Sequence, residues 1–260
     1  MYCNVCAHSS KFFEKAQVLN KYEVHYFQCE HCGFIQTEKP YWLDEAYSDA
    51  IAKSDLGLIS RNIALARISK VIIMTLFNSN AKFIDYGGGY GIFVRMMRDF
   101  GFDFYRSDKF CDNLFSHGFD ADVDGRNQYE LITAFEVFEH LVNPRDEIEH
   151  MLSFSKNILF STLLVPKDSP KPGQWWYYGL EHGKHISFYT PKSLKEIADR
   201  FQLNLYSNGS SLHLLTQKKI SSSWFNLLSR DKVSKILNLL LRKPSLLSSD
   251  FYLTTSKLLK

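Results

Sequence analysis

Four of the five cysteines in this 260-residue chain stand near its amino terminus, in two pairs with the same spacing. The pairs are Cys3-x-x-Cys6 and Cys29-x-x-Cys32. Each pair can bind one edge of a metal tetrahedron through a tight turn, so the two pairs predict one zinc ion held by four thiolates. A closed set of four sulfurs leaves no position for water, which makes the predicted zinc structural. Two disulfides or unrelated free thiols are the alternatives.

A second stretch with chemical potential runs from Phe83 to Phe93, where an apolar run meets Asp85 and then a glycine-dense turn. Glycine lets the backbone turn sharply and approach a ligand at places where a Cβ would collide. A dinucleotide fingerprint needs a further glycine three positions after the second, and Ile92 stands there instead. A tight turn without a ligand is the alternative. The glycines of the pattern are Gly87, Gly89 and Gly91.

An acidic residue follows the next expected strand. Phe102 to Tyr105 is predicted to form that strand, and Asp108 comes about 20 residues after the glycine turn, where a doubly wound fold places the acid that binds ribose hydroxyls. On its own Asp108 could equally be a solvated turn residue, but its pairing with the glycines favours a ligand role.

Residues 84–166 resemble the small-molecule branch of class I S-adenosylmethionine (SAM) methyltransferases. The resemblance rests on the Gly-x-Gly-x-Gly turn after Asp85, and on a strand from Tyr129 to Phe135 that leads into Glu139-His140-Leu141 and Asn143-Pro144. It implies an α/β fold with a doubly wound, Rossmann-like sheet of seven strands, and SAM as cofactor. The implied cofactor-binding residues are Asp85, Gly87, Gly89, Gly91, Asp108, Phe110 and Glu136.

The acceptor side carries a weaker resemblance. Enzymes that methylate base or glutamine nitrogens carry a polar-Pro-Pro-aromatic signature after this strand, and this chain has Ala134-Phe135-Glu136-Val137 there, so oxygen or carbon is the expected acceptor atom. A His-x-Ser-aromatic run beginning at His185 resembles zinc-ribbon sugar C-methyltransferases, whose Tyr-His-Glu-His run is matched only at its last histidine. The expectation is therefore O-methylation, rather than C-methylation, of a small hydroxylated acceptor such as a sugar or sugar nucleotide.

His185 is the predicted general base, because a neutral imidazole can take up a hydroxyl proton near neutral pH. The alternative is a structural histidine that binds backbone in a turn. The residues expected to shape the acceptor site with it are Tyr178, Glu181 and His182.

Four segments are expected along the chain: a zinc ribbon over residues 1–40, a connector and covering helix over 41–80, a SAM-binding domain over 81–220 and a helical extension over 221–260. The ribbon should contain a hairpin around Asn20-Lys21, and the covering helix should run from Leu56 to Phe77. In the extension, apolar residues on one helical face favour docking on the body or in a homodimer, with a membrane surface as the alternative.

The bulk composition limits the partners. Lys and Arg exceed Asp and Glu by only 31 to 28, which gives no strong nucleic-acid signal. The longest apolar run, Val71 to Phe77, is far too short to span a bilayer, and the amino terminus has no apolar signal region, so a cytoplasmic protein is expected. Two rivals remain: a non-catalytic SAM- or nucleotide-binding module that recruits a protein through its ribbon, and an RNA-directed methyltransferase.

Overall fold

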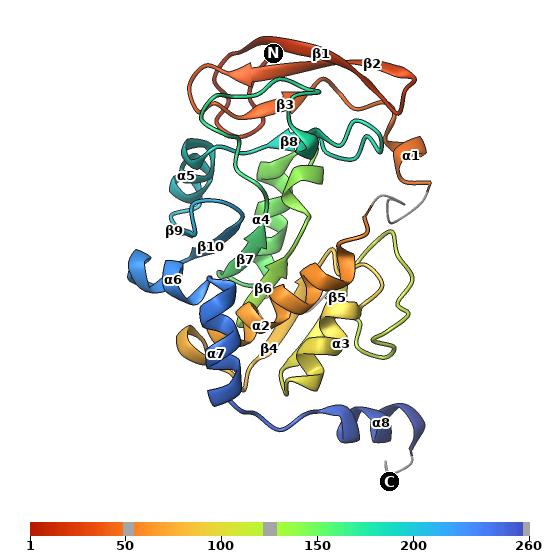
Figure 1. Ribbon diagram of the computed structural model, residues 1–260, viewed down its shortest axis with the longest axis vertical. Coiled ribbons are helices and arrows are strands. Elements are labelled where there is room, and N and C mark those ends of the chain that lie inside the picture. The colour runs from red at the N-terminus through yellow and green to blue at the C-terminus, as the bar shows by residue number, and fades with distance from the viewer. Residues whose placement is uncertain (49–54, 122–128, 257–260) are drawn as a thin grey trace. The chain divides into compact units, whose positions relative to one another are not determined.

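The computed structural model describes residues 1–48, 55–121 and 129–256. The chain forms two compact units that do not follow sequence order (Figure 1). The first unit combines Met1–Lys53, Glu136–His150 and Phe160–Lys218. The second combines Ser54–Phe135, Met151–Leu159 and Lys219–Lys260.

The first unit is built on an antiparallel four-stranded sheet in the order β1-β2-β3-β8. Figure 1 shows β8 beside the strands of the ribbon. The predicted hairpin is confirmed, with longer strands than expected, and Leu19 and Asn20 take positive φ values of 54° and 53° in its turn. The strands are β1 (Ser10–Val18), β2 (Tyr22–Cys29), β3 (Ile35–Thr37) and β8 (Ser187–Phe188).

Aromatic side chains pack the ribbon sheet against the segment that leads into β8. Tyr178 meets Tyr26 edge to face at 5.5 Å between ring centroids and lies 4.5 Å from Phe188. The indole N–H of Trp42 donates to the carbonyl of Gly183 at 2.8 Å. The ribbon and residues 175–189 therefore share one hydrophobic core.

Short helices complete the first unit. Helix α5 begins after Thr190, whose hydroxyl accepts from the backbone N–H of Ser193 in a capping box, with a proline in the first turn. The strand pair β9 (Asn204–Ser207) and β10 (Leu212–Thr216) is antiparallel. The helices are α1 (Leu43–Ala46), the one-turn η1 (Phe138–His140), α4 (Pro144–Phe154), which runs on into the second unit, η2 (Trp176–Tyr178) and α5 (Pro191–Arg200).

The second unit contains the parallel strands. Strand β4 pairs in parallel with both β5 and β6, and the stacked rings of Phe83 and Phe104 lie 5.0 Å apart between centroids. Helix α2 contacts α3 and α7 within this unit. The elements are α2 (Leu58–Leu76), β4 (Lys82–Tyr86), α3 (Ile92–Asp99), β5 (Asp103–Ser107), β6 (Leu131–Ala134), β7 (Ile158–Ser161), whose last two residues belong to the first unit, α6 (Ser222–Leu228), α7 (Asp231–Leu240) and α8 (Leu247–Thr255).

The larger sheet has the strand order β5-β4-β6-β7-β10-β9. The predicted α/β class with a mostly parallel sheet is confirmed. Among the described residues the sheet has six strands, where the resemblance implied seven.

The carboxyl-terminal helix α8 is fastened within the second unit by a buried ion pair. Asp250 accepts from Nε and Nη2 of Arg98 at 2.8 and 2.7 Å, and from Nη2 of Arg95 at 2.8 Å. Burial by itself would raise the pKa of Asp250, but the hydrogen bonds from the two guanidinium groups outweigh it and lower the pKa. The helical face expected to dock on the body lies in α7, which contacts α2. The attachment of α8 through Asp250 is an additional contact that was not predicted.

Replacing Asp250 by alanine is expected to destabilise the protein by about 3 kcal/mol, because it leaves a buried guanidinium without its main partner. In this variant Arg98 still has Asp103 as an ion-pair partner at 2.7 Å, so the expected loss in the free energy of unfolding is near the low end for buried ion pairs. Urea unfolding checks the value, with Asp99→Ala as the control, because Asp99 pairs with Arg95 at the surface. Equal losses in the two variants would contradict this role of α8.

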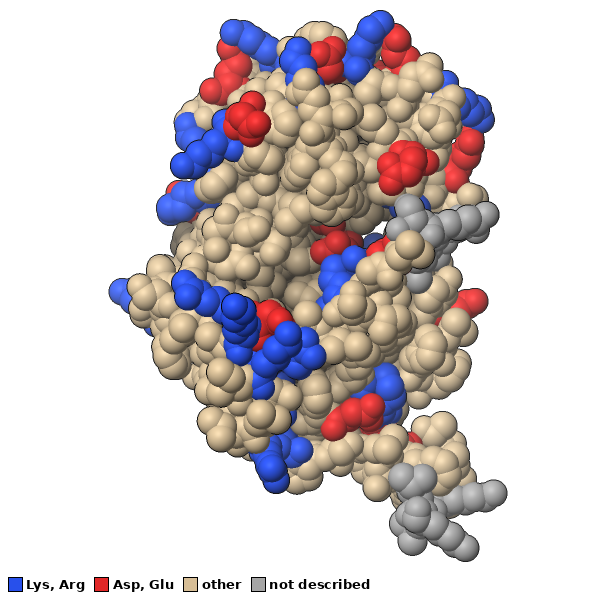
Figure 2. Space-filling view, viewed as in Figure 1, with Lys and Arg blue, Asp and Glu red and all other residues tan. Residues whose placement is uncertain are grey.

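Charges of both signs mix on the ribbon surface. Figure 2 shows positive and negative side chains interspersed over the end of the view that β1 and β2 occupy in Figure 1. Lys11 pairs with Glu30 there, and Lys15 with Glu23 at 3.0 Å. This face of the ribbon has no single-sign patch of the kind that clamps nucleic acid. Across 1–48, 55–121 and 129–256, no helix is long and apolar enough to cross a membrane.

Candidate functional site

The four predicted metal ligands lie together in the first unit. The Sγ atom of Cys6 lies 3.4 Å from that of Cys29 and 3.5 Å from that of Cys32. The Sγ atoms of Cys3 and Cys32 are 3.7 Å apart. Ligands of a tetrahedral zinc with Zn–S bonds of about 2.3 Å lie about 3.8 Å apart, so the donor set fits zinc. Backbone N–H groups of Val5 and Cys32 approach the sulfurs of Cys3 and Cys29 at 3.4 Å.

The pKa values of the cysteine thiols explain why a bound cation would stabilise this cluster. A hydrogen bond from Cys32 lowers the pKa of Cys3 to about 5, whereas burial raises the pKa of Cys6 to about 11. The hydrogen bond to Cys3 raises the pKa of Cys32 as well. Four adjacent thiols cannot all ionise while they repel one another, and a dication removes that repulsion. The three histidines of the ribbon are outside this sulfur set.

The cysteine site is tied to the cap of helix α5. The hydroxyl of Thr190 donates to the carbonyl of Cys32 at 2.5 Å. Gly33 has φ +73°, and a Cβ there would lie 3.2 Å from the Thr190 methyl group. The glycine after the second cysteine pair thus serves the turn and the close approach of this cap.

The glycine turn lies in the second unit between β4 and α3, as predicted. Gly87, Gly89 and Gly91 have φ values of 70°, 54° and 86°, which a glycine adopts without strain. A Cβ on Gly91 would lie 2.3 Å from the hydroxyl of Ser116, whereas a Cβ on Gly89 would meet nothing within 4 Å. The turn is therefore packed at its exit and open at its middle, where a ligand can approach the backbone.

Asp108 follows β5 and reaches the glycine turn. Its Oδ2 accepts from the backbone N–H of Gly89 at 2.9 Å, and its Oδ1 accepts from the N–H groups of Phe110 and Cys111, each at 2.8 Å. A carboxylate has about four acceptor positions, so one remains, on Oδ2. The side chain of Phe110, another expected cofactor residue, is exposed on the surface beside it.

Arg106, which the sequence pattern does not single out, holds this turn in place. Its Nε donates to the carbonyl of Gly89 at 2.5 Å, and its Nη1 donates to Asp120 at 2.9 Å. Its Nη2 donates to the carbonyl of Cys111. The available signal was an arginine directly after two aromatic residues of the strand, because a charged residue is rarely buried without partners.

Asp85 lies buried at the end of β4 beneath the turn. Its Oδ1 accepts from the hydroxyl of Thr133 at 2.6 Å, and its Oδ2 lies 2.8 Å from where a Cβ on Gly88 would stand. Burial raises the pKa of Asp85 to about 7, and the charge on Asp108 adds to the rise, while Thr133 and Arg106 oppose it. The carboxyl group is therefore poised to ionise when a cation approaches.

If a cationic ligand binds here, its affinity should rise with pH up to about 7 and level off above, because it is the ionised form of Asp85 that attracts the cation. Replacing Thr133 by valine removes a bond that lowers the pKa of Asp85, so the rise should move to higher pH. Calorimetric titration of SAM between pH 5.5 and 8 measures both effects. Thr75→Val, which removes a hydroxyl bonded only within α2, is the control. A flat profile in the unaltered protein would contradict the role of Asp85.

Glu136, the last expected cofactor residue, belongs to the first unit. Its φ of 54° is unusual for a residue with a side chain. The hydroxyl of Ser161 donates to its Oε1 at 2.6 Å and accepts from its backbone N–H at 2.8 Å. This pair of bonds stabilises the backbone turn where β6 ends.

The expected acceptor residues lie in the first unit and are only partly together. The rings of His182 and His185 are 4.8 Å apart between centroids, and the ring of His182 covers Gly179. Tyr178 points into the ribbon core, where its hydroxyl donates to the carbonyl of Pro170 at 2.9 Å. Glu181 is largely exposed, with a carboxylate oxygen 4.0 Å from His182. The tyrosine beside His185 is Tyr177, at 4.7 Å, which the sequence analysis did not select.

Two further residues that the sequence analysis did not select lie next to His185. Its ring is 5.0 Å from the ring of His140, and Glu139 completes a group whose candidate ligand atoms all lie within 4.8 Å of one another. Burial raises the pKa of Glu139 to about 8, and the carboxylate of Glu136 adds to the rise. Exclusion of water lowers the pKa of His140 to about 4, so its imidazole is neutral near pH 7.

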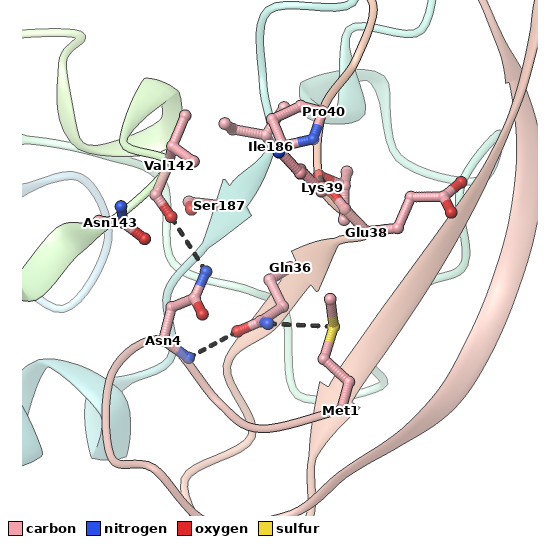
Figure 3. A pocket seen from close by; sticks show the side chains of 11 residues that line it. Met1, Asn4, Gln36, Glu38, Lys39, Pro40, Val142, Asn143, Ile186 and Ser187 are labelled. Carbon is pink, nitrogen blue, oxygen red and sulfur yellow. Dashed lines mark hydrogen bonds between the residues drawn. The ribbon is translucent and has the colours of Figure 1, made fainter.

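A separate pocket of about 190 Å³ lies beside the ribbon in the first unit (Figure 3). Asn4 donates from its backbone to Gln36 at 2.8 Å and from its side chain to the carbonyl of Val142 at 3.0 Å. The pocket is smaller than the roughly 300 Å³ of a small-molecule site, and none of the predicted site residues lines it.

Comparison with solved structures finds methyltransferases with low sequence identity. The plantazolicin methyltransferase BpumL in complex with SAH is 14% identical over 69% of this chain and 95% of that one, with a TM-score of 0.46. OxaC in complex with sinefungin and meleagrin is 17% identical over 54% of this chain and 44% of that one, with a TM-score of 0.40. An O-methyltransferase family 2 protein from Planctomyces limnophilus DSM 3776, in complex with apigenin, is 13% identical over 67% and 66%, with a TM-score of 0.38.

These likenesses carry no argument about the substrate of this chain, which spans less than half the length of OxaC. No curated protein matches the sequence. The family comparison is decisive, because residues 60–208, more than half of the chain, match the methyltransferase domain family. They include the glycine turn, Asp85, Asp108 and the segment around His185. This chain belongs to the methyltransferase domain family.

Proposed function

We propose that this protein transfers a methyl group from SAM to an oxygen atom of a small hydroxylated acceptor, with a sugar or sugar nucleotide as the acceptor class. The observation that carries the proposal is the glycine turn between Asp85 and Asp108. It is open at Gly89 and bordered by one buried and one strand-end carboxylate. The family match supports the same reading.

Each part of this turn fits one part of SAM. The open backbone at Gly89 can lie against the amino-acid tail and adenosine, and Asp85 can face the ammonium side. The remaining acceptor position of Asp108 can take a ribose hydroxyl, and the exposed ring of Phe110 offers an apolar face to the adenine. Glu136 is proposed as a further cofactor contact from the end of β6. When bound, SAM supplies a methyl group on a sulfonium, which is a good leaving group.

On the acceptor side we assign the hydroxyl contact to His185. Its Nδ1 lies 2.6 Å from the carbonyl oxygen of Tyr177. A carbonyl can only accept, so Nδ1 carries the proton and Nε2 carries the lone pair that a base requires. Glu181 and His182 would border the acceptor, whereas Tyr178 would support the site from the ribbon core.

Replacing His185 by alanine should lower turnover about a hundredfold and leave SAM affinity nearly unchanged. Steady-state kinetics with an identified acceptor and calorimetry with SAM check the two halves of this expectation. His150→Ala, on the exposed side of α4, is the control. A variant with full turnover would make His185 a structural residue.

The proposal as a whole is tested by calorimetry followed by product detection. SAM and its demethylated product should bind the purified protein, and NAD should not bind better. A panel of sugars, sugar nucleotides and phenols with labelled SAM then reveals a methylated product. Binding without transfer to any acceptor would favour the non-catalytic module, and a salt-dependent RNA affinity would favour the RNA-directed enzyme.

The four-cysteine site has a structural part in this function. Four thiols arranged to bind zinc fit a reducing compartment, so we place the enzyme in the cytoplasm.

A homodimer through the carboxyl-terminal helices stays a prediction, which sedimentation of the purified protein tests.

A further inference from the structure

A second cluster of possible metal ligands lies in the first unit, apart from the four cysteines. Glu139 and His140 come from the one-turn helix η1, and His185 comes from the segment before β8. One ligand atom from each side chain can be chosen so that all lie within 4.8 Å of one another.

Both histidines direct the same nitrogen to the backbone. Nδ1 of His140 lies 3.0 Å from the carbonyl oxygen of Lys184, and Nδ1 of His185 lies 2.6 Å from that of Tyr177. A carbonyl can only accept, so each Nδ1 carries the proton and each Nε2 carries the lone pair. Metal-binding histidines show this arrangement, because a carbonyl that accepts from the far nitrogen fixes the tautomer and the ring orientation. The hydroxyl of Tyr47 adds a contact to Nδ1 of His140 at 3.1 Å.

Glu139 gives the independent observation. Its side chain is fully buried, and neither carboxylate oxygen has a hydrogen-bond partner among the residues that the structure describes. The hydroxyls of Tyr177 and Thr162 come close enough to favour its ionised form slightly, without reaching hydrogen-bond geometry. An unpaired buried carboxyl group is costly in free energy, and a bound cation would remove that cost.

We propose that Glu139, His140 and His185 bind one divalent transition-metal ion, with zinc as the ion to be tested. Two imidazole nitrogens and one carboxylate oxygen form the ligand set of open zinc sites, in which the fourth position is left for water or substrate. Ligands around a tetrahedral zinc lie about 3.4 Å apart, so ligand atoms within 4.8 Å of one another would close by up to about 1.4 Å when the metal binds.

In catalysis this ion would act on the acceptor, and that part of the inference rests on the proposed function. An acceptor hydroxyl bound at the open position loses its proton to water more readily, as zinc-bound water does. Nε2 of His185 would then bind the metal and not the acceptor hydroxyl, because one lone pair cannot bind both. The binding of the ion itself is independent of the methyl transfer.

The experiment is calorimetric titration of zinc chloride into the full chain that already holds its cysteine-bound zinc. One further equivalent should bind, and elemental analysis after dialysis should then find two zinc ions per chain. Glu139→Gln and His185→Gln should each weaken the additional site at least a hundredfold, since even second-shell partners contribute 10- to 100-fold. His150→Gln is the matched control and should bind zinc as the unaltered protein does.

Folding does not confound the result. Glu139→Gln keeps the side-chain shape and removes a buried acid, so its melting temperature without added zinc should not fall. Added zinc should raise the melting temperature of the unaltered protein and of His150→Gln, but not that of Glu139→Gln. Cobalt in place of zinc should show a nitrogen and oxygen site in addition to the thiolate site. A single zinc per chain, or a second zinc that both variants keep, overturns the inference. SAM titrations on the same samples show separately whether the proposed function holds.

Discussion

Cys29→Ser is expected to remove the zinc and unfold the ribbon. A serine hydroxyl does not replace a thiolate, and a structural zinc of this kind contributes on the order of 10 kcal/mol to the folding of a short segment. The ribbon has too little core of its own to compensate for that loss. Elemental analysis should find the cysteine-site zinc missing, and amide exchange should show β1, β2 and β3 unprotected.

Unfolding of the ribbon in Cys29→Ser should also destabilise the acceptor side of the first unit. β8 pairs with β3, and Trp42 and Tyr26 contact Gly183 and Tyr178. Residues 175–189 should therefore lose protection together with the ribbon, while SAM binding by the second unit persists. Cys111→Ser, outside the cysteine site, is the control and should keep both zinc and exchange protection. A ribbon that stays protected without zinc would contradict this prediction.

Asp108→Ala should have the largest effect on cofactor binding. The substitution removes the remaining ribose acceptor and leaves the N–H groups of Gly89, Phe110 and Cys111 without their shared partner. We expect a loss of about 3 kcal/mol in SAM binding, which is about 150-fold in affinity, because hydrogen bonds to a charged group are among the stronger ones.

Calorimetry with SAM and with its demethylated product measures the loss. Asp108→Asn keeps one acceptor oxygen and should lose less, and Asp112→Ala, on the exposed part of the same segment, should bind as the unaltered protein does. Unchanged affinity in Asp108→Ala would remove this residue from the cofactor site.

The parts of the site set by local spacing could be predicted from the sequence. Cys3 to Cys6 and Cys29 to Cys32 are each close enough in the chain for a tight turn to fix their geometry, and the glycine turn follows from the strand before it. The helices that begin at Pro144 and Pro191 could be predicted for the same reason, because their first turns carry their own signals.

The parts set by tertiary packing could not be predicted. Tyr177 and Tyr178 are neighbours in the sequence and both lie in the core that the ribbon shares. Only tertiary packing decides that Tyr178 meets Tyr26 and that Tyr177 lies beside His185. Glu139 was noticed only as part of a motif, since nothing in the chain around it indicates that its carboxylate is buried. Arg106 was missed because its partners belong to three separate segments of the chain.

The place of β8 at the edge of the ribbon sheet has a consequence for how the protein is made. Ile35 pairs with Phe188, and these residues lie roughly 150 positions apart in the chain, so this pairing raises the contact order of the unit. On the ribosome the cysteine pairs can collect their metal early, yet β3 keeps an open edge until most of the chain has been synthesised. The ribbon is therefore not an independent domain that can be transferred to another protein. If it were cut after Pro40 and fused elsewhere, β3 would have an unpaired edge that favours aggregation.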